Sequence, residues 1–342
     1  MATADETFEK IHAPGTMTAP ERVGNTAGDS VDNAGNNTAR NQGIAFLLLT
    51  VFAWGLNWPV NKLILESMSP YWLVTIRSAI AALALLLIAL PGRKLVVPPR
   101  ADLPVLLSIT CLHMVGFAVF ATVGLELVPV GRSVVLAYTS PLWVIPGAAL
   151  FLGERLTPRR LFGVMLGLIG LAVLFNPLAF DWNDRNSILG HAALLAAALC
   201  WSMSILHVRA HTWRSTPFQL VPWETMLATL ILLAIALASQ SWISIDWSAR
   251  LVILLFVTST FGTVLPYWAV ASAGRRLSAG AVSLGLLGTP IVGILAATFA
   301  LGEVPDAVVW VAIVCVTGGV LIGTWTNGGS AARHATKDRG LG

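Results

Sequence analysis

The chain has 342 residues, of which 56% are hydrophobic and 11% are charged, and its formal net charge at pH 7 is +4. Soluble domains carry about 25% charged residues, so this composition excludes an ordinary soluble protein. The small positive charge does not indicate a nucleic-acid partner, and we expect an all-α integral membrane protein that lies in a lipid bilayer.

The N-terminal stretch is rich in Ala, Gly, Thr, Asn and Asp. It contains no apolar run of the kind that a signal peptide needs, so we do not expect a cleaved leader. We expect residues 1–42 to form a disordered cytoplasmic tail, and residues 327–342 to form a second one.

Ten apolar segments follow, joined by short connections. About 20 residues of α-helix cross the ~30 Å hydrocarbon core of a bilayer, and the segments have about this length. The predicted spans are 44–64, 71–91, 103–126, 131–151, 160–177, 187–208, 218–239, 251–273, 278–300 and 306–326.

Much of the second half of the chain repeats the first. The stretch 131–170 returns 149 positions later, and the part before it returns 147 positions later. We therefore predict two five-helix repeats, 43–177 and 190–326, with a connecting loop at 178–189. The matched positions include Trp54 and Trp201, Lys62 and Arg209, Pro141 and Pro290, and Glu154 and Glu303.

In each copy a proline interrupts an apolar helix, and the helix then ends at Gly-Glu. Because proline lacks a backbone donor and presses on the preceding turn, Pro141 and Pro290 predict a bend in each copy. Glu154 and Glu303 can be polar helix stops at the membrane interface or can fix a gate. We favour the structural role, because a carboxylate at the end of a span need not be buried.

Lys and Arg in the loops predict the orientation, since cytoplasmic loops carry an excess of both. The basic side is then cytoplasmic, which places both termini inside a bacterial inner membrane. Each repeat has an odd number of spans, so the second repeat enters the membrane inverted. The basic loops contain Arg93, Lys94, Arg100, Arg155, Arg159, Arg160, Arg209, Arg214, Arg275 and Arg276, and the opposite loops contain Lys62, Arg132, Arg185 and Arg250.

Together these motifs resemble the EamA-like branch of the drug/metabolite transporter superfamily, over about 44–326. The resemblance rests on the segment from Pro141 to Gly170, with Gly163 and Gly167 inside it, and on Pro290, Gly302-Glu303 and Gly318-Gly319. It implies an exporter of amino acids or other metabolites, and the aromatic-rich spans are most similar to bacterial amino-acid exporters of the YddG type. The second copy departs from the pattern, because Ala312 and Val316 replace two glycines. We expect this change to weaken the last helix as a close-packing face.

Two charged residues fall within the spans at equivalent positions of the two repeats. Arg77 and Glu224 each follow a Ser/Thr-Pro pair by seven residues, which places each about 10 Å inside its own face. Since the repeats are inverted, their depths differ by about 10 Å, and we do not expect a direct ion pair. Both should face the protein interior or water, although a long Arg77 side chain can also snorkel to the interface.

Further candidates for a solute-binding cavity are aromatic or polar residues in the middle of the spans. Trp54 and Trp201 lie too deep for an interfacial belt, so they line a cavity or pack between helices. His113 can relay protons or serve as a hydrogen-bonded packing residue. The complete predicted substrate-binding set is Trp54, Asn57, Trp58, Arg77, His113, Phe117, Tyr138, Trp201, Glu224, Tyr267 and Trp268.

These features predict a secondary transporter that exports a small organic solute by alternating access, with an aromatic or other apolar amino acid as the expected substrate. The alternatives are a nucleotide-sugar or drug/metabolite carrier of the same superfamily, or an intramembrane enzyme. Nucleotide sugars would require several deep basic residues, and catalysis would require a convergent set of reactive side chains. The spans carry only isolated ionisable residues.

No cofactor or metal is expected, because the three cysteines lie alone in separate apolar runs. A monomer is the working expectation. Coupling to protons stays open, with Glu224 and His113 as the candidate carriers.

Overall fold

A computed structural model describes residues 26–89, 96–175, 182–239, 245–277 and 279–324, and all regular structure in these residues is helical. The chain divides into two compact units, Met1–Ala39 and Arg40–Gly342. The predicted tail 327–342 and residues 1–25 lie outside the described residues. The first helix begins at Thr26, within the stretch predicted to be disordered. A helix that is already nucleated by an apolar span can extend at little cost, because elongation needs no new nucleus.

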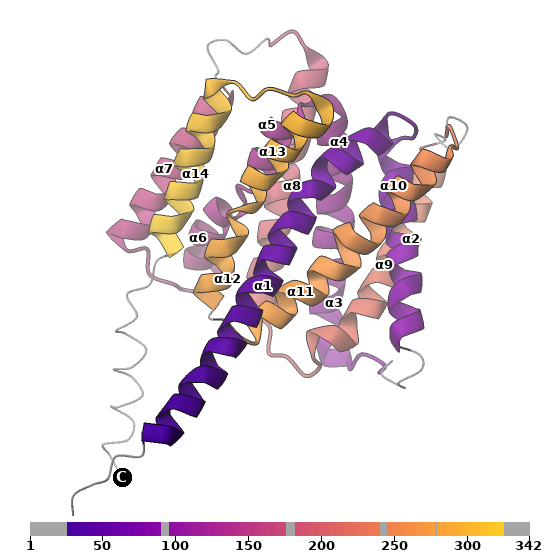
Figure 1. The fold of residues 1–342 in the computed structure, drawn as a ribbon. Coiled ribbons are helices and arrows are strands. Elements are labelled where there is room, and N and C mark those ends of the chain that lie inside the picture. The colour runs from indigo at the N-terminus through magenta and orange to yellow at the C-terminus, as the bar shows by residue number, and fades with distance from the viewer. Residues whose placement is uncertain (1–25, 90–95, 176–181, 240–244, 278, 325–342) are drawn as a thin grey trace, which may run out of the picture. The chain divides into compact units, whose positions relative to one another are not determined.

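Figure 1 shows the helical elements, several of which divide one predicted span into two pieces. Their bounds are α1 Thr26–Leu65, α2 Pro70–Ala89, α3 Leu103–Ser108, η2 Ile109–Phe117, α4 Ala118–Leu127, α5 Val130–Ala137, α6 Ser140–Phe151, α7 Pro158–Phe175, α8 Arg185–Ala210, α9 Pro217–Ala238, α10 Ala249–Ser259, η4 Thr260–Val264, α11 Leu265–Gly274, α12 Ala279–Leu286, α13 Thr289–Leu301 and α14 Ala307–Thr324.

Eight helical runs within the described ranges are long and apolar enough to cross a membrane. Each coincides with one of the first eight predicted spans. The ninth predicted span corresponds to the two short helices α12 and α13. The tenth corresponds to α14, whose apolar stretch Ala307–Gly323 is shorter than the eight. An integral membrane protein is therefore well supported, while ten crossings stay a prediction.

The outer surface of the second unit has large apolar side chains that a water-soluble protein would bury. Leu150, Phe151 and Phe299 are 79%, 77% and 88% exposed. Contiguous apolar surface of this kind indicates contact with another apolar phase, which for this composition is lipid.

The proline in each repeat lies at a complete helix break. Pro141 lies in the first turn of α6, directly after a break at Tyr138-Thr139. At this break the Thr139 hydroxyl donates to the Leu136 carbonyl at 2.7 Å, and the Ser140 hydroxyl donates to the Ala137 carbonyl at 3.0 Å. Pro290 lies in the first turn of α13 in the same way. The sequence predicted a bend, and the structure has two separate helices at each site. At the first site, broken backbone is tolerated at this depth because the Thr139 and Ser140 side chains donate to carbonyls that the break leaves free.

The Gly-Glu dipeptides do end their helices, as expected. Gly153 and Gly302 adopt φ values of +66° and +69°, a left-handed conformation that favours glycine. At the start of the second repeat, Asp184 accepts a hydrogen bond from the Asn186 N–H at 3.0 Å and caps α8. Because this cap fixes the helix start at Arg185, the helix begins inside the predicted connecting loop 178–189.

The last helices of the two predicted repeats, α7 and α14, lie side by side (Figure 1). A Cβ added at Gly163 would lie 2.5 Å from the Gly319 carbonyl oxygen, so the backbones nearly touch. The expectation that Ala312 and Val316 weaken this face is wrong. A Cβ on Gly170 would lie 3.0 Å from the Ala312 carbonyl, which shows that at the level of Ala312 the α7 glycine alone permits close approach.

Candidate functional site

A cavity of about 780 Å³ lies among α1, α2, η2, α4, α8, α9, η4 and α11. Its lining comes from both predicted repeats. Ten of the eleven residues predicted to bind substrate lie in this lining, and Glu224 does not. The ten are Trp54, Asn57, Trp58, Arg77, His113, Phe117, Tyr138, Trp201, Tyr267 and Trp268.

Two wide helical segments form part of the cavity wall. The segments η2 and η4 are π-helical, and they fall at equivalent repeat positions, since the shift of 147 carries 109–117 to 256–264, a range that contains η4. The extra residue in a π-helical turn changes which side chains face inward. This local geometry carries His113 and Phe117 to the cavity and turns the following helix so that Tyr267 also reaches it. The sequence did not predict these segments.

Trp201 lies at the centre of a group of aromatic rings. Its indole stacks on the imidazole of His113, with centroids 5.6 Å apart and an interplanar angle of 3°. Phe117 and Tyr138 contact the same indole, at centroid distances of 5.1 and 5.7 Å. Aromatic pairs at such distances stabilise one another, so Trp201 holds in place two side chains of η2 and the Tyr138 side chain that follows α5.

The aromatic wall continues toward α1 and α11. Tyr267 contacts the His113 ring at 6.2 Å and the Trp54 ring at 5.9 Å, both edge to face. Trp58 contacts Tyr138 at 6.5 Å. This wall offers flat apolar surfaces to a ligand, in a cavity whose size is typical of small-molecule sites.

Trp268 differs from the other aromatic residues of the lining because it is 45% exposed. Its ring packs edge to face on Phe46, with centroids 5.0 Å apart. Trp268 therefore lies at the edge of the cavity, where the wall meets the outer surface.

Arg77 is the single residue of the described lining with a permanent charge. The Tyr267 hydroxyl, which also belongs to the lining, is in electrostatic contact with its guanidinium. No carboxylate lies within ion-pair distance of Arg77 in the described part of the chain. The side chain therefore faces the cavity, which favours this orientation over snorkelling to the interface.

Glu224 is buried beside the cavity, and it is only 3% exposed. Its neighbours Val221 and Thr225 line the cavity while Glu224 does not. It is in electrostatic contact with Tyr267, as Arg77 is, and the described residues contain no direct ion pair between Arg77 and Glu224. The prediction that the two do not pair directly agrees with this arrangement.

Two polar residues of the lining, Asn57 and Asn61, are held by Thr258, which is buried outside the lining. Its hydroxyl lies 2.6 Å from Asn57 Oδ1 and 2.7 Å from Asn61 Oδ1. Asn57 also packs against Gly262 so closely that a Cβ there would collide with the amide. Sequence reasoning missed Asn61, although its spacing of four residues from Asn57 places the two on one helix face.

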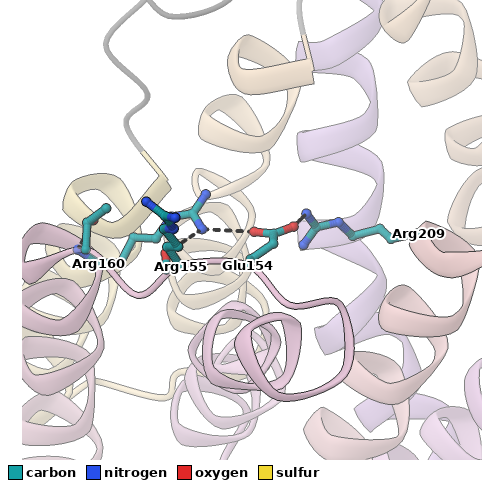
Figure 2. A network of polar contacts seen from close by, with 5 residues as sticks. Glu154, Arg155, Arg160 and Arg209 are labelled. Carbon is teal, nitrogen blue, oxygen red and sulfur yellow. Dashed lines mark hydrogen bonds and ion pairs between the residues drawn. The ribbon is translucent and has the colours of Figure 1, made fainter.

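The residues predicted to be structural or gating lie outside this lining. Figure 2 shows the Glu154 carboxylate between Arg160 and Arg209, which join it from α7 and α8. The Arg160 bridge measures 2.9 Å. Glu303 accepts a hydrogen bond of 2.8 Å from the Val130 backbone N–H at the start of α5. Both glutamates therefore fix the ends of helices, which agrees with a structural role.

Lys62 and Arg209, which are equivalent in the two predicted repeats, make related contacts. Arg209 bonds to Glu154 of the other half. Lys62 donates to the carbonyls of Leu125, Glu126 and Val128 at the end of α4. Glu303 accepts a hydrogen bond from the Val130 N–H in the same turn. Each cation thus lies beside the Gly-Glu helix end of the opposite half, as two halves related by a pseudo-twofold axis would place it.

Comparison with known proteins agrees with these observations. A model described as the EamA-like transporter family matches residues 41–176 and 188–325. Position 188 lies 147 after 41 and position 325 lies 149 after 176, the same two shifts that relate the halves of the sequence.

Two curated relatives and one solved structure are similar to the chain. It is 29% identical over 281 residues to a probable amino-acid metabolite efflux pump of Escherichia coli (strain K12), over 78% of this chain and 88% of that protein. It is 36% identical over 118 residues to a riboflavin transporter of Rhizobium johnstonii, over 34% of this chain and 37% of that protein. A crystal structure shares the fold, with a TM-score of 0.57 and 20% identity over 84% of this chain and 98% of that chain. The chain belongs to the EamA-like transporter family, and it is a multi-pass membrane transporter.

Proposed function

We propose that this transporter exports small organic solutes, with aromatic or other apolar amino acids as the expected cargo, by alternating access between two inverted five-helix repeats. The observation that carries the proposal is the cavity of about 780 Å³, whose aromatic wall is built by both halves around the stacked rings of His113 and Trp201. A cavity between two repeats is where secondary transporters hold their solute. Flat apolar walls with a few polar groups favour a small solute that has an apolar side chain.

The name of the Escherichia coli relative, a probable amino-acid metabolite efflux pump, supports both the cargo and its direction. The distribution of Lys and Arg in the loops supports ten spans with both termini in the cytoplasm of a bacterium. Labelling of cysteines introduced near the two termini, in intact and permeabilised cells, tests this orientation. Reaction of either terminus in intact cells would contradict it.

The transport function is tested with the purified chain in lipid vesicles. Vesicles preloaded with unlabelled L-phenylalanine should accumulate labelled L-phenylalanine by exchange, and the same assay extends to the other amino acids. Trp201→Ala should reduce the initial rate at least about tenfold, because the residue supports three other rings of the wall. Trp247→Ala is the matched control, since Trp247 is 59% exposed and lies outside the cavity lining.

A second cargo, a flat vitamin such as riboflavin, is favoured by one specific observation. The Rhizobium relative named as a riboflavin transporter is 36% identical over 118 residues of this chain. Labelled riboflavin in the same exchange assay separates the two cargoes. Uptake of riboflavin without exchange of any amino acid would replace our proposed cargo with the vitamin. A nucleotide sugar has less support, because Arg77 is the one basic side chain with a fixed charge in the described lining.

A further inference from the structure

The cavity has one charged group whose counter-charge is not supplied by its own wall. Arg77 lies on α2 and belongs to the cavity lining, and Tyr267, which interacts with it electrostatically, contributes a hydroxyl and not a carboxylate. The described ion pairs do not include Arg77, and no Asp, Glu or Lys belongs to the described lining. A guanidinium held in a poorly solvated cavity is costly unless a negative group pairs with it.

The nearest candidate for that negative group, Glu224, does not supply it. Glu224 is buried behind the lining, and it has no ion pair to Arg77. Tyr267 lies in electrostatic contact with both residues. The charge of Arg77 therefore remains available to a molecule that enters the cavity.

The rest of the wall defines what else that molecule must contain. The lining that contains Arg77 also has an aromatic part, in which the His113 ring contacts both Trp201 and Tyr267. A guanidinium binds a carboxylate through two parallel hydrogen bonds, which is the geometry that one arginine satisfies best. A phosphate that carries two charges would leave one of them unpaired in this lining. The flat rings of the lining offer the surface on which a planar apolar body of the solute can stack.

We propose that the cavity recognises an organic carboxylate with a planar apolar body, that Arg77 binds the carboxylate, and that an amino group is tolerated without being required. This inference rests on the proposed transport function, and it names the substrate class of the same cavity. The described lining contains no carboxylate that could pair with an ammonium group. An aromatic amine without a carboxylate would place its positive charge near Arg77 and should bind poorly. Aromatic amino acids and their amine-free analogues should both bind.

Three probes of similar shape separate these requirements. They are L-phenylalanine, 3-phenylpropanoate, which lacks the amine, and phenethylamine, which lacks the carboxylate. Each is added to the purified full-length chain, and binding is measured as the rise in Tm over a concentration series, which does not depend on transport. The expected order is that phenylalanine and phenylpropanoate bind within a few-fold of each other, while phenethylamine binds at least about tenfold more weakly.

Substitution of Arg77 tests whether this residue is the receptor. Arg77→Gln should weaken the binding of L-phenylalanine and of 3-phenylpropanoate at least about tenfold. It should also remove the preference of the protein for these two carboxylates over phenethylamine. Arg77→Lys keeps the charge but loses the paired hydrogen bonds, so it should retain part of the preference for carboxylates over phenethylamine. This variant keeps the test valid if the glutamine variant folds poorly. Arg250→Gln is the matched control, because Arg250 is exposed and lies outside the cavity lining. Elution of each variant as one symmetric peak in size-exclusion chromatography verifies folding.

The outcomes separate this inference from the transport function. Equal binding of phenethylamine and phenylpropanoate, no binding by any of the three probes, or an unchanged preference in both Arg77 variants overturns the carboxylate inference. Carboxylate-selective binding that depends on Arg77 supports it, whether or not the vesicles exchange phenylalanine. Absence of exchange for every amino acid and for riboflavin, with selective binding intact, overturns the transport proposal alone.

Discussion

The imidazole of His113 lies parallel to the indole of Trp201, with an interplanar angle of 3° and centroids 5.6 Å apart. His113 belongs to the first predicted repeat, and Trp201 belongs to the second. The stacked pair therefore joins the two halves across the cavity that it lines. A solute beside these rings would contact both halves at once, and under the proposed alternating-access mechanism that contact would couple its binding to a relative movement of the halves.

The first prediction concerns this stacked pair. Among the described contacts His113 makes ring contacts and no hydrogen bond, so its aromatic shape should matter more than its ability to carry a proton. His113→Phe should keep at least about half of the wild-type exchange rate, because aromatic pairs are stabilised without the imidazole nitrogens. His113→Ala should lose most of the wild-type exchange rate. Loss of exchange in the phenylalanine variant, with correctly folded protein, would instead assign His113 a proton-relay role.

Much of this cavity could be predicted from the sequence, because residues at equivalent positions of the two repeats lie at comparable depths within their helices. Trp54 and Trp201 occupy equivalent places in the two halves, and both reach the cavity. Glu224 shows where this reasoning ends. Its equivalence with Arg77 places Glu224 at a comparable depth in its own half. Equivalence does not fix the direction of the side chain, because successive residues of a helix are separated by about 100° around the axis. A small difference in helix rotation therefore turns Glu224 behind the wall while Val221 and Thr225 face inward.

The π-helical segments could not be predicted for a related reason. The run from Ile109 to Phe117 has an ordinary apolar composition, and nothing in its periodicity distinguishes it from an α-helix. A π-helical turn persists where tertiary contacts offset its poorer local geometry. Such contacts bring together residues that are distant in sequence. One example is Cys200, which lies so close to Gly116 that a Cβ added at Gly116 would be 3.1 Å from the Cys200 sulfur.

The second prediction uses two adjacent glycines of α14. A Cβ added at Gly319 would collide with the Gly163 carbonyl and lie 2.7 Å from the Gly167 nitrogen, whereas a Cβ at Gly318 would meet only Leu166, at 3.7 Å. Gly319→Ala should therefore lower the unfolding free energy by about 1–3 kcal/mol, because two backbones must separate. Gly318→Ala should be neutral or should stabilise by up to about 1 kcal/mol through helix propensity.

Thermal unfolding of the two purified alanine variants measures this difference directly. The pair is well matched, since the change in chemistry is identical and the sites are neighbours in one helix. Equal melting temperatures for both variants would contradict the close packing of α7 against α14.

The third prediction concerns coupling to protons. A buried carboxylate next to a solute pathway is the kind of group that proton-coupled transporters use, and Glu224 is 3% exposed beside the cavity. Glu224→Gln keeps the shape and cannot release a proton. We expect it to retain phenylalanine exchange and to abolish the extra accumulation driven by an imposed pH gradient. Gradient-driven accumulation at the wild-type rate in this variant would remove Glu224 from the candidate carriers.

The fourth prediction concerns the pH dependence of the contact that joins α14 to α5. Arg132 bonds to Asp306 at 3.0 Å, and Asp306 also accepts a hydrogen bond of 3.0 Å from the Val309 backbone N–H. Partial burial opposes ionisation of Asp306, but these hydrogen bonds and the charge of Arg132 outweigh it and hold the pKa of the carboxyl below its ordinary value of 3.8. The ionised form is therefore stabilised by folding.

Because the folded pKa is the lower one, this contribution is complete above about pH 4 and is lost as the pH falls through the folded pKa. The side chains of Arg132 and Asp306 are 30% and 50% exposed, so solvent screening should limit the ion pair to less than about 1 kcal/mol. Asp306→Asn should retain the helix cap and lose the ion pair, whereas Asp306→Ala should lose both. We expect the melting temperatures to fall in the order wild type, asparagine, alanine at pH 7. The gap between wild type and asparagine should narrow once the pH drops below the folded pKa, and a gap of constant size would show that the ion pair does not contribute.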